Sequence, residues 1–171
     1  KSFSVLIIRS FGVLLLFSFT LFITNFYSAE NVGRYDFVRS TLMVLGGLCL
    51  MGTNQSIIYY SGLLNARKSI ESIRIIYFKM LKIIFTLSLF ILVLFLTFFN
   101  KKIINDIFSN EESYSLILKT ILTLAFFTLT MLNIDTIRAL KKTIISEMYR
   151  SLFRYLPVFI FAVILLQTNN E

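Results

Sequence analysis

The chain has 171 residues, of which 57% are hydrophobic, and its mean hydropathy is +0.80. It carries 17 Lys and Arg against 9 Asp and Glu, one cysteine and no histidine. A soluble domain would carry more charge and more turn residues, a lone cysteine argues against a disulfide framework, and histidine chemistry is excluded. The composition predicts an all-α, polytopic transmembrane helix bundle in a lipid bilayer, without cofactor or metal. The positive excess then indicates cytoplasmic loops and anionic lipid, not nucleic acid.

The first predicted span is the uncharged stretch between Arg9 and Glu30. A bilayer core needs roughly 20 apolar residues, and this stretch is longer than the apolar region of a signal peptide and lacks a clean cleavage site. We therefore expect a membrane helix. The connection that follows, residues 29–36, contains Asn31 and Gly33 and is predicted to be a short turn.

The second span is predicted to be one helix from Gly33 to Tyr60, because positions 40–66 carry no charge. Small side chains recur in it at helical spacing, at Gly46, Cys49, Thr53 and Ser56. Such a face lets a neighbouring helix come close, which is how helices associate in lipid. Arg39 lies seven residues before Gly46 and therefore on the same face.

The rest of the chain predicts two further full spans and part of another. A basic amphipathic segment at 65–82 should lie on the membrane surface and lead into the third span, Ile83–Phe99. A mixed loop at 100–113, with a short helix at the membrane edge, precedes the fourth span, Tyr114–Ile137. A second basic amphipathic segment follows at 138–154, and then the apolar residues 155–166. These residues are too few for a full span, so we expect either that the fifth helix begins earlier, around Ser146, or that the chain has been cut there.

The basic segments predict the orientation of the chain. Most of the 17 cations lie at the N-terminus, in 65–82 and in 138–154. The positive-inside rule then places these three parts in the cytoplasm, and 29–36 and 100–113 outside. We expect a multi-pass membrane protein with a cytoplasmic N-terminus.

Several polar side chains in or near the spans are candidates for lining a cavity: Arg39, Arg9, Asn54, Gln55, Arg34 and Asp135. Each has a structural alternative. Arg9 and Arg34 could anchor span ends at the interface, and Asp135 could pair with Arg138 along its helix. Asn54 and Gln55 could hydrogen-bond a neighbouring helix. For Arg39, substrate contact and anchoring of the helix end stay equally open.

The order of several short motifs resembles the N-terminal half of bacterial polysaccharide and O-antigen flippases. These form the Wzx-like oligosaccharide-flippase branch of the multidrug/oligosaccharidyl-lipid/polysaccharide (MOP) exporter superfamily. The motifs are Arg9 with Gly12, Gly33 with Tyr35, Met51-Gly52-Thr53-Asn54-Gln55, and Arg138-Ala139-Leu140-Lys141-Lys142. Members have twelve to fourteen helices in two bundles around a cavity. The resemblance therefore implies that 1–171 is the N-terminal part of a larger transporter.

The resemblance also implies a function without covalent catalysis. The protein would move an undecaprenyl-diphosphate-linked oligosaccharide across the membrane for capsule, O-antigen or lipopolysaccharide synthesis, alongside other polysaccharide-assembly membrane proteins. Cavity arginines would compensate the charge of the diphosphate. Other exporters of the superfamily, namely a multidrug antiporter or a lipid II flippase, stay open, as does a small membrane scaffold. A polymerase or acyltransferase would need a large polar loop or a histidine.

Overall fold

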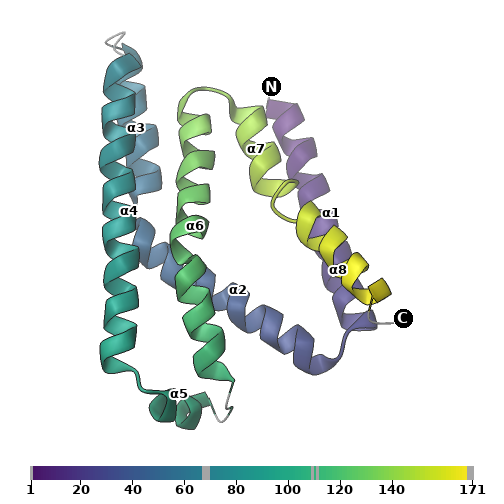
Figure 1. The fold of residues 1–171 in the computed structure, drawn as a ribbon. Helices are drawn as coiled ribbons and strands as arrows, with labels where there is room; N and C mark the ends of the chain where they lie inside the picture. Colours follow the sequence, from purple (N-terminus) through teal and green to yellow (C-terminus); the bar gives the residue numbers. More distant parts are fainter. Residues whose placement is uncertain (1, 67–69, 109, 111, 169–171) are drawn as a thin grey trace. The chain divides into compact units, whose positions relative to one another are not determined.

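The computed structural model describes residues 2–66, 70–108, 110 and 112–168, and the regular structure in this part of the chain is α-helical (Figure 1). The predicted all-α class is therefore confirmed. The helices are α1 (Ser2–Phe26), α2 (Ala29–Leu50), α3 (Thr53–Ala66), α4 (Ile70–Phe98), α5 (Lys101–Phe108), α6 (Ser113–Ala139), α7 (Thr143–Ser151) and α8 (Leu156–Thr168). They form two compact units: the end unit, Lys1–Gly33 with Ile137–Glu171, and the middle unit, Arg34–Thr136.

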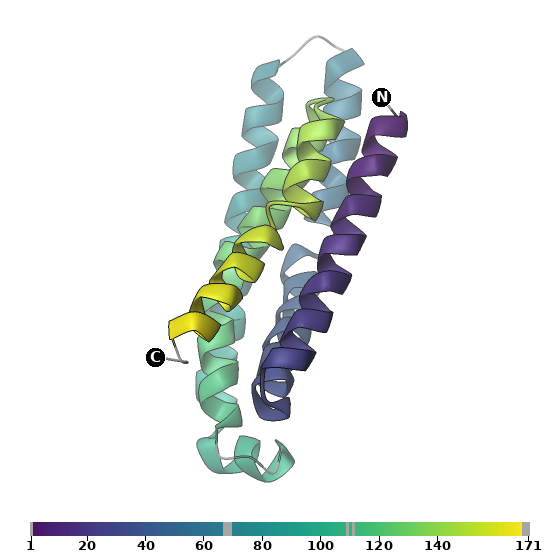
Figure 2. The same ribbon diagram turned by 90° about the vertical axis from the view of Figure 1, so that its right-hand side faces the viewer.

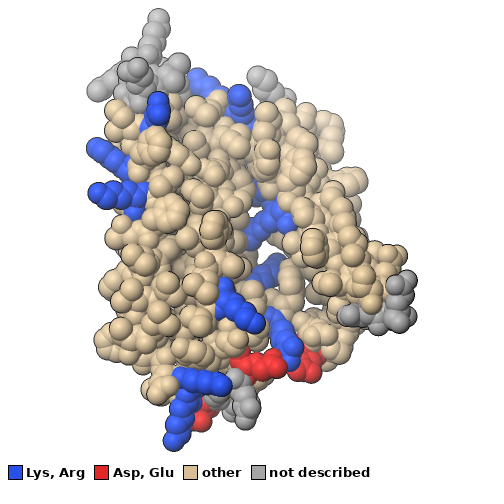
Figure 3. Space-filling view, in the orientation of Figure 1, with Lys and Arg blue, Asp and Glu red and all other residues tan. Residues whose placement is uncertain are grey.

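Four stretches of the described chain are long and apolar enough to cross a membrane: Phe3–Phe26, Ile73–Phe98, Ser113–Ala139 and Thr143–Thr168. The pair α2 and α3, bent by 44°, is a fifth candidate. Large side chains such as Phe17, Phe90 and Phe126 stay exposed on these helices, as lipid-facing side chains do. In Figure 3 the lower stretch of α4 is uncharged. The chain has the helices of a multi-pass membrane protein.

The connection between the first two spans is shorter than predicted. Ser28 caps α2, because its Oγ accepts a hydrogen bond from the backbone N–H of Asn31 at 3.4 Å and its carbonyl accepts one from Val32 at 3.1 Å. Glu30 in the first turn adds a favourable charge at the positive end of the helix dipole. The predicted turn at 29–36 is therefore wrong: this cap outweighs the turn preference of Gly33, which lies inside α2.

The second span is broken, and the predicted single helix from Gly33 to Tyr60 is wrong. Met51 and Gly52 have φ angles of 39° and 78°, in the left-handed region, where an α-helix cannot continue. Glycine adopts this conformation without steric cost. The Gly52 carbonyl then accepts hydrogen bonds from the N–H groups of Gln55 and Ser56, at 3.1 and 2.9 Å, and so starts α3.

The small-residue face of α2 lies inside the middle unit, as predicted. Gly46, Cys49 and Thr53 are buried. A Cβ added at Gly46 would lie 2.6 Å from Cε1 of Phe127, so a ring of α6 occupies the space beside this glycine. On α4, the hydroxyl of Ser88 donates a hydrogen bond of 3.6 Å to the Cys49 sulfur. The face therefore contacts both α4 and α6.

Two apolar clusters complete the middle unit. The first contains Phe95, Ile104, Ile117 and Ile121 and joins α4, α5 and α6. The short helix expected in 100–113 is thus present as α5, and it is packed through Ile104. The second cluster contains Ile57, Ile84 and Leu132 and joins α3, α4 and α6. The Tyr77 hydroxyl donates a hydrogen bond of 2.7 Å to Oδ1 of Asn133 beside it.

The basic segment 65–82 is not a separate helix on the surface. From Ile70 to Phe98 the chain is one helix, α4, so Arg74, Lys79 and Lys82 lie on its first turns. Arg67 and Lys68, which were predicted to share this segment, lie outside the described residues. The third span is correspondingly longer than the predicted Ile83–Phe99 and needs no snorkelling to reach across a bilayer.

In the end unit, α1 runs parallel to α7 and α8. Successive residues of α1 contact successive residues of α7 and α8 in the same order along the chain. Arg9 meets Glu147, Phe19 meets Phe159 with ring centroids 5.9 Å apart, and the Tyr27 hydroxyl donates a 2.6 Å hydrogen bond to the Ala162 carbonyl. Figures 1 and 2 show the same common direction. Of the two alternatives for the fifth span, the early start is the one seen, because Thr143–Thr168 forms one candidate span.

This parallel arrangement bears on the number of crossings. If two parallel helices both cross a membrane, an odd number of crossings must separate them. Two lie between α1 and α7, namely α4 and α6, so one more is required. The bent pair α2 and α3 is the candidate that supplies it. The parallel direction of α1 and α7, together with the candidate spans between them, therefore favours five crossings over four.

We expect labelling from the two sides of the membrane to show five crossings. In a Cys49→Ser background, single cysteines at the exposed positions 29, 101 and 142 are to be treated with an impermeant reagent. With five crossings, Ala29→Cys and Lys101→Cys react from one side and Lys142→Cys from the other. If α2 and α3 instead return to the side they left, positions 29 and 101 react from opposite sides.

Neighbouring glycines of α2 test its packing. Gly46→Leu should destabilise the fold by about 1–3 kcal/mol, because the new side chain meets the Phe127 ring. Gly47→Leu is the matched control. Nothing lies within 4 Å of a Cβ there, so leucine should be neutral or slightly stabilising in the helix. The measurement is the thermal unfolding midpoint in detergent, and equal loss in both variants would contradict the assigned face.

Candidate functional site

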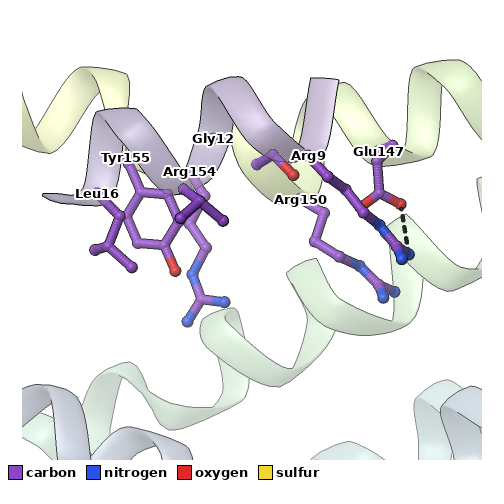
Figure 4. A pocket seen from close by; sticks show the side chains of 9 residues that line it. Arg9, Gly12, Leu16, Glu147, Arg150, Arg154 and Tyr155 are labelled. Carbon is purple, nitrogen blue, oxygen red and sulfur yellow. Dashed lines mark hydrogen bonds and ion pairs between the residues drawn. The ribbon is translucent and has the colours of Figure 1, made fainter. Parts of the chain in front are cut away.

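The end unit contains a cleft of about 360 Å³ between α1 and the α7–α8 segment. It combines three guanidinium groups with one carboxylate and an apolar wall (Figure 4). Its lining residues are Arg9, Gly12, Val13, Leu16, Glu147, Arg150, Ser151, Arg154 and Tyr155.

Arg9 and Glu147 form a two-contact ion pair across the cleft. Nε of Arg9 lies 2.6 Å from Oε1 of Glu147, and Nη2 lies 3.3 Å from Oε2. The Glu147 side chain is 6% exposed, whereas that of Arg9 is 54% exposed. A buried carboxylate needs such a partner, because burial of an unpaired charge is expensive. Arg9 is therefore fixed to α7 and keeps part of its guanidinium open to its surroundings.

The other two arginines come from the end of α7 and the turn after it. Arg150 and Arg154 are both half-buried. In Figure 4 the guanidinium of Arg150 extends toward the Arg9–Glu147 pair, and that of Arg154 points to the same side. The Arg154 guanidinium carbon also lies 5.5 Å from the centre of the Tyr155 ring, a cation–π distance. Glu147 and Arg150 lie three residues apart on α7, which brings them to one face, and the turn after α7 adds Arg154 to the same lining.

Gly12 marks a close approach of α1 and α7 in the lining of the cleft. A Cβ added there would lie 2.5 Å from Cβ and 3.1 Å from Cα of Ser151. The second atom belongs to the backbone and cannot move aside as a side chain can. The helices α1 and α7 therefore approach each other at this pair, and the cleft opens on either side of it. Gly12 was singled out in the sequence, but its partner Ser151 was not.

Of the six predicted candidates, the cleft contains only Arg9. Arg34 instead pairs with Glu112 at 2.6 Å in the middle unit, with side chains 39% and 53% exposed. An ion pair this exposed contributes at most about 1 kcal/mol. Its geometry fits the anchoring alternative, in which Arg34 fixes the start of the middle unit's α2 to the residues before α6.

Arg39 lies further along α2, roughly 15 Å from Ala29 at 1.5 Å per residue. It is half-buried. No hydrogen bond or ion pair joins it to another described residue. A charge that borders a membrane-spanning stretch and is partly buried normally has a partner or a function. Of the six candidates, Arg39 is therefore the one we consider first as a ligand-binding residue.

The amides lie just beyond the break between α2 and α3. Asn54 is half-buried and Gln55 is exposed. The neighbouring Thr53 is 5% exposed, and its buried Oγ1 has no hydrogen-bond partner in the described part of the chain. Asp135 lies elsewhere, buried at 5% exposure in α6. The predicted candidates thus occupy several places in the fold and do not form one site.

The cleft residues that the sequence did not single out are Glu147, Arg150 and Arg154. A signal was present, because the three lie at spacings of three and four in the basic segment 138–154. Chemically, the arrangement can bind an anion through guanidinium groups. In the described part of the chain, no group of three or more Cys, Asp and Glu side chains is placed to hold a metal ion.

The Arg9–Glu147 pair gives a stability prediction. Arg9→Met leaves the buried carboxylate unpaired and should cost about 1–3 kcal/mol. Arg9→Met with Glu147→Met removes both charges and should be more stable than the single variant. Arg34→Met, which breaks the exposed pair with Glu112, is the control and should cost less than about 1 kcal/mol. Unfolding midpoints in detergent provide the comparison, and a double variant weaker than Arg9→Met would contradict the argument.

Known proteins do not identify the family of this chain. No protein-family model, no curated protein and no solved structure matches it. The flippase resemblance of its short motifs therefore stays a prediction.

Proposed function

We propose that this chain is the N-terminal part of a membrane transporter that carries an undecaprenyl-diphosphate-linked oligosaccharide across the bacterial cytoplasmic membrane. The observation behind this proposal is Arg39, a half-buried cation that directly precedes the uncharged part of α2 and has no partner among the described residues. A helix that only spans the membrane gains nothing from such a charge. A helix that binds an anion inside the membrane requires one.

The chemistry of a diphosphate suits an arginine better than a lysine. The headgroup must leave water to cross the membrane, and its charge must then be compensated by the protein. A guanidinium offers two parallel N–H donors to two phosphate oxygens, whereas an ammonium acts as a point charge. Arg39 lies on the same helix face as the buried Gly46 and Cys49, so it is directed toward protein more than lipid.

The break in the second span also favours a transporter. Broken helices in membranes occur where the backbone lines a cavity or is covered by protein, and many transporters bind their substrates at such breaks. The break at Met51 and Gly52 follows Arg39 by less than four helical turns. In this proposal α2 carries the anion site, and the change of angle at Gly52 lets α2 move relative to α3 during alternating access.

The proposed transport requires no covalent chemistry and no cofactor. The substrate arrives from the cytoplasmic leaflet, where the basic segments 65–82 and 138–154 would lie. Other membrane proteins of polysaccharide assembly would supply and accept the lipid-linked unit. The sugar composition does not enter the argument, because the diphosphate and the polyprenyl chain are common to such substrates.

Replacement of Arg39 in the native full-length protein tests the proposal. Arg39→Ala should abolish polysaccharide export at normal membrane protein level, because the diphosphate loses its counter-charge. Arg39→Lys should restore only part of the export, because the charge returns without the two-donor fork. The measurements are surface polysaccharide and the amount of protein in the membrane, taken from the same cells.

Lys119→Ala is the matched control, because Lys119 is also a cation within a candidate span but is exposed. It should export normally. Full export by Arg39→Ala would remove Arg39 from the site. Full export by Arg39→Lys, together with a reduced amount of membrane protein in Arg39→Ala, would mean that Arg39 only anchors α2.

A further inference from the structure

The cleft in the end unit has no role in the function proposed above, which depends on α2 in the middle unit. We propose that this cleft binds the phosphate headgroup of an anionic membrane phospholipid. The lipid belongs to the leaflet from which α1 and α7 enter the membrane. The argument rests on the charge of the cleft, its level in the membrane and its apolar wall.

The charge of the cleft selects an anion. Three guanidinium groups face one carboxylate, and the Arg9–Glu147 pair accounts for one of each. Two further guanidinium groups, those of Arg150 and Arg154, line the same cleft, and each also has another interaction of its own. A phosphodiester carries one negative charge and several acceptor oxygens, which suits two guanidinium groups. A volume of about 360 Å³ is within the range of small-ligand sites.

The level of the cleft selects a lipid headgroup. Arg9 is the last charged residue of α1, and residues 10–26 after it are uncharged. Arg154 is likewise the last charged residue before the uncharged α8. Because α1 runs parallel to α7 and α8, and Arg154 follows Glu147, the partner of Arg9, by seven residues, the uncharged parts of α1 and α8 begin within roughly 10 Å of each other at 1.5 Å per residue. This short range is where the hydrocarbon of a bilayer begins and where headgroup phosphates lie.

The wall of the cleft distinguishes a lipid from a free anion. Val13 and Leu16 line it beside the guanidinium groups. Farther along the same helices, Phe22 of α1 and Phe159 of α8 pack with ring centroids 5.3 Å apart. Tyr155 borders the cleft with an apolar ring and a polar hydroxyl, a side chain typical of the membrane interface. An acyl chain can continue from the headgroup along this apolar surface, whereas inorganic phosphate gains nothing from it.

Thermal unfolding of the native full-length protein in neutral detergent tests the inference. A ligand that binds only the folded protein raises its unfolding midpoint. Phosphatidylglycerol should raise the midpoint, while phosphatidylcholine with the same acyl chains and inorganic phosphate should leave it within about 1 °C. In Arg150→Gln with Arg154→Gln the apparent affinity for phosphatidylglycerol should fall at least about tenfold, because two charged hydrogen-bond donors are lost.

The control variant is Lys141→Gln with Lys142→Gln. It removes the same charge from the same basic segment at exposed positions that do not line the cleft. Its affinity for phosphatidylglycerol should stay within about twofold of the unchanged protein, because distant exposed charges are screened by salt. If the arginine double variant does not fold, the single variants Arg150→Lys and Arg154→Lys provide the test. They keep the charge and should each bind several-fold more weakly.

Several results would overturn the inference. Equal stabilisation by inorganic phosphate would indicate a free-anion site. Stabilisation by undecaprenyl diphosphate but not by phosphatidylglycerol would indicate a substrate site. Unchanged affinity for phosphatidylglycerol in the arginine variants, or an equal loss of affinity in the lysine control, would show that the lipid does not bind in the cleft. Arg39→Ala should keep the full response to phosphatidylglycerol, so failure of the transport proposal and failure of this inference are distinguishable.

Discussion

The fold depends on a constraint of the bilayer: apolar surface gains nothing when it moves from lipid to protein. Helices must then be held by close contact and by polar ties. Both units show this. Gly12 lets α1 approach the Ser151 backbone, and Gly46 lets α2 approach the Phe127 ring. Each unit also has a polar interaction between helices. It is the Arg9–Glu147 ion pair in the end unit and the Ser88–Cys49 hydrogen bond in the middle unit.

The same constraint explains why the broken second span is informative. A backbone that leaves helical geometry inside a membrane gives up hydrogen bonds that lipid cannot replace. Here Cys49 before the break and Thr53 after it are buried, whereas Met51 within the break is 72% exposed. Such a break costs stability and persists only where the rest of the fold supports it. Arg39 and the break lie on one span, and this coincidence connects the packing of the middle unit to the transport proposal.

Much of the architecture could be predicted because lipid leaves a simple signature of long uncharged runs. The helical class and the candidate spans followed from it, whereas the small-residue face at Gly46 followed from the helical spacing of small side chains and the short helix within 100–113 from its apolar residues. Local conformational preferences caused the errors. The cap at Ser28 outweighed the turn preference of Gly33, and the positive φ angles of Met51 and Gly52 interrupted an uncharged run. The cleft could not be foreseen as a whole. Composition indicates that Arg9 and Glu147 are charged, but it does not indicate which distant helix each one meets.

The end unit is built from the two ends of the described chain, and this has a consequence for biogenesis. Arg9 and Glu147 are 138 positions apart, with the whole middle unit between them. At about 5–20 residues per second, a ribosome needs roughly 7 to 30 seconds between the two. During that time α1 resides in the membrane without the helix that pairs its arginine. The insertion machinery or the lipid itself must accommodate this helix until α7 emerges, and only then can Arg9 form its ion pair with Glu147.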